Sequence, residues 1–128
     1  GLGLGVIKGT VPLDGASYNL VRTGEKNGEL PRFYRPAFGS KESTWRQASP
    51  TLHVMDGRRI PPMLILYVDR PVSPERAKEL AETLREHGYD AEAVLAKKRS
   101  HKSLNKRLGA KGDKYGPMIV DFFRSQMN

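Results

Sequence analysis

The feature that most constrains the fold is an unbroken apolar run, Met63-Leu64-Ile65-Leu66-Tyr67-Val68. It has no polar residue at alternate positions, which is typical of a strand buried on both faces in a parallel sheet covered by helices. After the turn Arg70-Pro71-Val72, Ser73 is a candidate helix N-cap and Pro74 suits the first helical position. The run and the turn therefore predict a buried strand that leads into a helix.

The segment after this turn has the period of an amphipathic helix. Its apolar positions recur at i, i+3, i+4 and i+7 and are Ala77, Leu80, Ala81 and Leu84. Gly88 supplies a C-terminal stop, and residues 89–96 then read as a second strand. Strand, helix and strand in this order predict a βαβ core over residues 62–96, with parallel strands and a right-handed crossover.

The other segments complete a single domain over residues 1–128, which is the usual organisation at this length. They are a short strand over residues 6–13, a loop-rich stretch over 14–39, a short helix over 41–47 with Trp45 turned inward, a histidine-bearing loop over 97–114 and a C-terminal helix over 117–127. The expected fold is therefore α/β, with about three parallel strands and helices on both faces. One edge of so small a sheet is open, so we expect a homo-oligomer or a companion chain to cover it.

Composition excludes several kinds of site. The chain has no cysteine, so it contains no disulfide, no thiolate metal site and no cysteine nucleophile. No group of side chains has metal-ligand spacing, and we expect neither a metal nor a cofactor. No apolar run approaches membrane-spanning length and nothing resembles a signal peptide, so we expect a cytoplasmic protein with no membrane partner.

The positive charge is concentrated in one loop. The formal net charge is +8, and the residues between Lys97 and Lys114 include eight basic side chains against one acidic side chain, Asp113. Such a loop can attract a phosphate or another anionic ligand, although a solvated loop on a basic protein is the commoner case. We keep an anionic ligand as the functional interpretation, and nucleic acid is not the partner we expect.

A carboxylate and an imidazole follow the two predicted strands of the core. Asp69 lies just past the first strand, and His101 lies in the loop after the second. The carboxyl ends of parallel strands meet at one edge of a sheet, where ligands of open α/β sheets bind. Asp69 could therefore orient His101 as a general base. The alternative is that Asp69 only starts a turn and that His101 is an exposed loop residue.

Several motifs resemble the C-terminal part of α/β-hydrolases of the carboxylesterase and lipase-like branch. The histidine loop of that branch, roughly T-H-x-S-L-N-R-x-L-G, is similar to Ser100-His101-Lys102-Ser103-Leu104-Asn105-Lys106-Arg107-Leu108-Gly109. Residues 48–54 and 60–62 resemble its A-S-P-x-x-H-V and I-P-P motifs, and residues 11–16 resemble the end of the preceding strand. The resemblance covers almost the whole chain and implies that His101 is the triad histidine. It implies Asp69 as the acid, although the turn here is one residue shorter than the common G-x-x-D-P-x-V-P version.

The nucleophile is the missing part of this pattern. The family orders its triad as serine, acid and histidine, with the serine on a G-x-S-x-G turn between a strand and a helix, which would lie before residue 1. The nearest match is Gly15-Ala16-Ser17-Tyr18-Asn19, where Asn19 replaces the last glycine and a polar loop follows. The preferred interpretation of Ser17 is therefore an ordinary serine in a loop at the end of a strand, and its role as a nucleophile is the weaker interpretation.

Three functions remain open. The chain could be the C-terminal part of a serine esterase that is nearly inactive alone, because its nucleophile and oxyanion donors are absent. It could be a non-catalytic binding module that uses its basic loop for an anionic partner. It could also be an autonomous hydrolase that uses Ser17.

Overall fold

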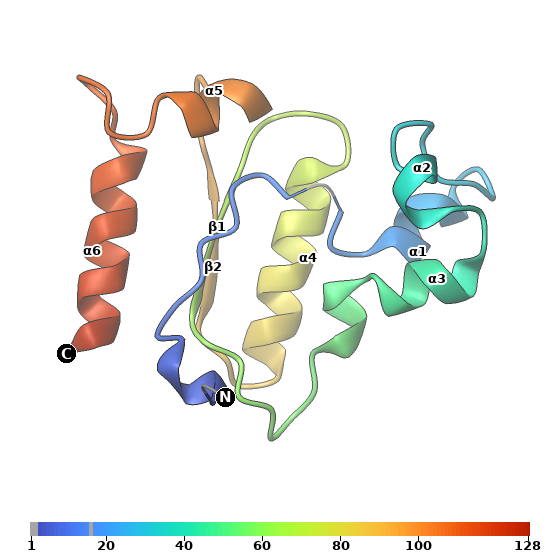
Figure 1. Ribbon diagram of the computed structural model, residues 1–128, viewed down its shortest axis with the longest axis horizontal. Coiled ribbons are helices and arrows are strands. Elements are labelled where there is room, and N and C mark those ends of the chain that lie inside the picture. The colour runs from blue at the N-terminus through green and yellow to red at the C-terminus, as the bar shows by residue number, and fades with distance from the viewer. Residues whose placement is uncertain (1–2, 16) are drawn as a thin grey trace.

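The computed structural model describes residues 3–15 and 17–128, and its centre is a small parallel sheet (Figure 1). Strands β1 (Met63–Tyr67) and β2 (Ala91–Leu95) run parallel, with Met63 opposite Ala91 and Tyr67 opposite Leu95. Helix α4 (Ser73–Glu86) connects the two strands. The predicted α/β class and the βαβ core are therefore confirmed.

The predicted third strand is reduced to two isolated bridges. Residues Leu4–Val6 form a short 3-10 helix, η1, and the segment after it pairs with β1 in parallel at Thr10 and Leu13. The amides of Thr10 and Asp14 donate to the carbonyls of Pro62 and Leu66 at 2.9 and 2.7 Å. Between them stands Pro12, which has no N–H, so the ladder lacks its middle bond. Prediction of a continuous strand here was wrong, although its position beside β1 and its direction were right.

Two helices cover opposite faces of the sheet (Figure 1). On one face, Leu80 and Leu84 of α4 pack against Ile65 in a single buried cluster. On the other face, α6 (Tyr115–Met127) packs Tyr115 into a cluster with Leu66 and other side chains. Because β1 contributes side chains to both clusters, its sequence is apolar at every position.

A third core lies in the segment that was predicted to be loop-rich. It contains residues of α1 (Leu20–Glu25), α2 (Arg35–Phe38) and α3 (Glu42–Gln47), and the 3-10 helix η2 (Pro50–His53) that follows contacts α4. Trp45 is buried there and its indole Nε1 donates to the carbonyl of Gly39 at 3.1 Å, which confirms the inward position expected for Trp45. Helix α1 has too few residues to show a period, so this small core had no signal in the sequence.

Two helix starts affect the functional site. At α4 the N-cap position is Val72, with φ of 73°, and Ser73 is the first helical residue rather than the predicted cap. In the histidine loop, Ser100 caps a short helix, α5 (His101–Lys106), and the side chain and backbone of Ser100 and Ser103 form a capping box. No helix in the described parts of the chain is long and apolar enough to cross a membrane.

Candidate functional site

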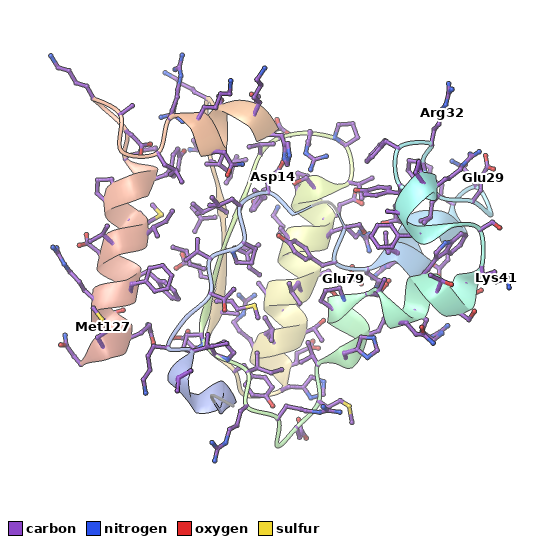
Figure 2. The ribbon with its side chains drawn as sticks, viewed as in Figure 1. Asp14, Glu29, Arg32, Lys41, Glu79 and Met127 are labelled. Carbon is purple, nitrogen blue, oxygen red and sulfur yellow. The ribbon has the colours of Figure 1, made fainter. Side chains whose placement is uncertain are left out.

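Three segments of the chain end at the same edge of the sheet, beneath α5 (Figure 1). Asp14 follows the N-terminal bridging segment, Arg70 and Ser73 follow β1, and His101 follows β2. All of these strands are parallel, so this is the carboxyl edge, at which ligands of open α/β sheets bind. Figure 2 labels Asp14 at this edge.

Asp14 is the centre of the cluster, and its side chain is 0% exposed. Its Oδ1 atom accepts hydrogen bonds from the hydroxyl of Ser73 and, at 3.1 Å, from the amide of Val68. Its Oδ2 atom accepts from Arg70 Nε at 2.7 Å and lies 2.8 Å from His101 Nδ1. Burial by itself raises the pKa of Asp14, but these four donors outweigh it, so the pKa lies below its usual value. The group is therefore a buried carboxylate anion, held by donors from the segment after β1 and from the start of α5.

His101 is the exposed member of the pair. It is the first residue of α5, and its side chain is 59% exposed. Since an ionised carboxylate only accepts hydrogen bonds, the contact with Asp14 places the proton on Nδ1 of the neutral ring and leaves the lone pair on Nε2. Within the described residues Nε2 has no hydrogen-bond partner. This arrangement can act as a general base at Nε2.

The structure corrects the predicted partner of His101. Asp69 follows a buried residue, Val68, and is exposed, as expected when side chains alternate at the end of a strand. No hydrogen bond joins Asp69 to His101 in the described chain. Asp14 instead forms the contact with His101 that was predicted for Asp69. The signal for Asp14 was present in the sequence, because Asp14 also ends a predicted parallel strand and reaches the same edge.

Ser17 is not brought to the histidine. Its hydroxyl lies 2.9 Å from the hydroxyl of Thr23 and accepts from the amide of Asn19 at 3.4 Å. Of the hydroxyl groups in residues 3–15 and 17–128, none hydrogen bonds to His101. The described chain therefore presents a base and its orienting carboxylate, with no nucleophile placed against them.

Backbone strain marks the same three loops. In the described chain, three non-glycine residues have positive φ: Asp14 (49°), Val72 (73°) and Lys98 (59°). One follows each of the three parallel segments. Such conformations cost about 1–3 kcal/mol each and persist where surrounding contacts hold them, often at functional sites. Here the hydrogen bonds from Arg70 and Ser73 to Asp14 stabilise two of these loops, the one at Asp14 and the one at Val72.

The basic loop surrounds His101. Its one acidic residue, Asp113, is buried and forms an ion pair with Arg99 at 3.2 Å. The other basic side chains are exposed, and they are Lys97, Lys98, Lys102, Lys106, Arg107, Lys111 and Lys114. Positive potential at this edge would therefore attract anionic molecules to the neighbourhood of His101.

The described residues contain no group of three or more histidine, aspartate or glutamate side chains that could hold a metal ion. Comparisons of the chain with protein-family models, with curated proteins and with solved structures found no match. The likeness to carboxylesterases therefore depends on the motifs of the sequence alone.

Proposed function

We propose that this chain supplies the base and its orienting carboxylate to an acyl-transfer site of the serine esterase type. The observation that carries the proposal is the contact of His101 Nδ1 with the fully buried carboxylate of Asp14. The resemblance of residues 100–109 to an esterase histidine loop gives independent support.

In this proposal His101 first accepts a proton from the attacking hydroxyl and then donates it to the leaving group. Nε2 removes the proton of an attacking hydroxyl as the hydroxyl oxygen forms a bond to the carbonyl carbon of an ester. The imidazolium that results is stabilised by the charge of Asp14, and it then gives the proton to the departing alkoxide. Asp14 remains ionised throughout, which its lowered pKa favours.

The nucleophile would come from a companion chain. The outer edge of the N-terminal segment pairs with no strand in the described chain, and beside it Val6 and Ile7 are about half exposed. Helix α6 adds an exposed apolar stripe containing Val120 and Phe123, and Gly9 lies against the ring of Phe122 on the same helix. A sheet edge and an apolar helix face that lie together suit a partner that adds both a strand and a helix. A homo-oligomer is the other assembly that would cover this face.

The experiment is hydrolysis of an activated ester, p-nitrophenyl acetate, by the isolated chain. We expect slow turnover that His101→Ala reduces to the level of buffer and the remaining histidines. Asp14→Asn should also reduce it, because the neutral amide no longer fixes the tautomer. The matched control is His87→Ala, since His87 also contacts an aspartate but lies elsewhere. Turnover unchanged in His101→Ala would contradict the proposal.

A fluorophosphonate probe, read by intact mass, then tests where the nucleophile lies. We expect no adduct, because no serine hydroxyl in the described chain contacts His101. An adduct on Ser17 that His101→Ala abolishes would show instead that the chain is an autonomous hydrolase.

A second function, binding of an anionic partner without catalysis, is favoured by the seven exposed basic side chains of the loop. Retention on heparin that weakens with salt, in a chain with no esterase activity, would support it. Retention that salt does not change would exclude the loop as its cause.

A further inference from the structure

A cavity of about 310 Å³ lies between helix α1 and the start of helix α4. Its lining residues are Arg22, Thr23, Lys26, Pro71, Val72, Glu75 and Arg76. The volume is at the lower end of the range for small-molecule sites. Three of the lining side chains are cationic and one is a carboxylate, so the cavity has a positive character.

Two of these cations share one carboxylate, Glu79, which is not among the lining residues. Glu79 Oε1 accepts from Arg22 Nη1 at 3.0 Å and from Asn19 Nδ2 at 2.9 Å, and Glu79 Oε2 accepts from Arg76 Nη1. Figure 2 shows Glu79 projecting from α4 toward α1. Since one carboxylate cannot neutralise two guanidinium groups, Arg22, Arg76 and Glu79 together keep a net positive charge.

The carboxylate in the lining compensates little of this charge. Glu75 lies 3.5 Å from Arg76 Nη2, and its side chain is 76% exposed, so solvent screens the contact. Lys26 forms no ion pair with any residue that the structure describes. A bound anion would therefore supply the charge that the cavity lacks.

Arg76 provides an independent observation. The residue is only 8% exposed, and its Nε atom is buried with no hydrogen-bond partner among the described residues. A buried donor without an acceptor costs about 1–3 kcal/mol, and in native proteins such a group usually has an ion or water as its partner. Nε itself is closed to solvent, but Arg76 lines the cavity and its Nη2 atom has no carboxylate nearer than Glu75 at 3.5 Å, so an oxyanion bound there could accept from that end of the guanidinium.

The start of α4 adds a favourable field. This helix has 14 residues, and Val72, Glu75 and Arg76 of its first turn line the cavity. The amides of Ser73 and Arg76 already donate to the carbonyls of Arg70 and Val72, and Pro74 has no N–H, so the contribution of this end is the helix dipole, which favours negative charge.

We propose that this cavity binds a small oxyanion, the carboxylate or phosphate group of a low-molecular-weight ligand, through Arg22, Lys26 and Arg76. The proposal stands apart from the esterase chemistry at His101, because none of the lining side chains contacts that histidine. The two proposals can therefore fail separately.

The test is an NMR titration of the full chain with inorganic phosphate and, separately, with succinate, each against sodium chloride at matched ionic strength. We expect saturable shifts at the amides of Thr23, Val72 and Glu75 with one or both anions. A response to phosphate alone or to succinate alone would identify the anionic group that the site prefers, and both results support the site.

Variants on the surface keep the test independent of folding. We expect Arg22→Gln to weaken binding about tenfold, the effect of losing one charge-assisted hydrogen bond. The matched control is Arg46→Gln. The side chains of Arg46 and Arg22 are 59% and 60% exposed, and each forms an ion pair with one glutamate, but Arg46 does not line the cavity. Shifts that never saturate, shifts confined to residues 97–114, or equal affinity in Arg22→Gln and the wild type would each overturn the proposal.

Discussion

The described residues include two histidine–aspartate pairs at opposite ends of the sheet, which have similar distances but differ in the environment of the carboxylate. At the carboxyl edge His101 Nδ1 lies 2.8 Å from Asp14, and at the other end His87 Nδ1 lies 2.6 Å from Asp56. The side chain of Asp14 is 0% exposed, whereas that of Asp56 is 86% exposed. Solvent and salt screen the second pair, and water competes for its hydrogen bond.

The contacts around each carboxylate also distinguish the two pairs. Asp14 has three donors besides the histidine, and they come from Val68, Arg70 and Ser73. For Asp56 the described chain provides His87 as its one side-chain partner. A short distance alone therefore does not define a general base, because the carboxylate must also be fixed in place before the reaction.

The largest expected effect separates the two carboxylates by stability. Asp14→Asn should lower the free energy of unfolding by about 3 kcal/mol, because it leaves the guanidinium of Arg70 and the amide of Val68 around a neutral side chain. Asp56→Asn should leave the midpoint of urea unfolding unchanged, because its side chain is exposed. Circular dichroism during urea titration measures both variants, and equal midpoints would contradict the difference described above.

Acid sensitivity gives the next effect, at a second buried carboxylate. The side chain of Asp113 is 1% exposed, and burial by itself raises its pKa. The amides of Gly109, Tyr115 and Gly116 and the side chain of Arg99 more than compensate, and they lower the pKa from 3.8 to about 2. Because the folded pKa is the lower one, the stabilisation is complete above about pH 4 and is lost as the pH falls toward 2.

Replacement of Asp113 should remove part of that acid sensitivity. We expect Asp113→Asn to make the free energy of unfolding less dependent on pH between about 4 and 2 than in the wild type. Asp121→Asn is the control, since Asp121 on α6 is 75% exposed. Urea unfolding at a series of pH values measures the slopes, and the same slope in Asp113→Asn and the wild type would show that Asp113 is not responsible.

A smaller effect is expected at the hydroxyl that supports Asp14. Ser73→Ala removes one buried donor to the carboxylate and should cost about 1–2 kcal/mol of stability. Ser125→Ala is a suitable comparison, because the hydroxyl of Ser125 is exposed and donates within its own helix. If both substitutions cost the same, the environment of Asp14 would not depend on Ser73.

The smallest effect is expected at the cap of α5. Ser100→Ala removes the side chain that accepts from the amide of Ser103, and it should cost about 1 kcal/mol or less. Because His101 is the first residue of this helix, ester hydrolysis should also decrease slightly. Thermal unfolding and the p-nitrophenyl acetate assay measure the two effects. Unchanged ester hydrolysis together with a lowered melting temperature would show that the cap stabilises the helix without affecting His101 as a base.

Local patterns predicted the core of this fold, whereas the partner of its histidine could be predicted only by comparing the ends of all three parallel segments. The apolar run at residues 63–68 and the stripe on α4 each lie within a few residues, so they identify a strand and a helix directly. The contact between Asp14 and His101 joins residues 87 positions apart, and it forms only when three parallel segments align. The prediction considered two of those segments, and Asp69 was chosen for that reason.

Other differences between the predicted and the observed structure also have specific causes. Pro12 interrupts the ladder of the N-terminal segment, where a short strand over residues 6–13 was predicted. Ser73 was predicted to cap α4, but its hydroxyl donates to a carboxylate 59 positions away. A tertiary hydrogen bond to a buried anion is stronger than a local cap, and no pattern near Ser73 indicates it.

The central claim is that the buried Asp14 holds the neutral ring of His101 with its proton on Nδ1 and its lone pair on Nε2. Long-range ¹H–¹⁵N NMR of the histidine rings tests this most directly, in the wild type and in Asp14→Asn. We predict that His101 is protonated at Nδ1 in the wild type and shifts toward the Nε2-protonated tautomer in Asp14→Asn, while the ring of His87 is unchanged. A wild-type His101 that carries its proton on Nε2, or a tautomer that Asp14→Asn does not alter, would contradict the claim.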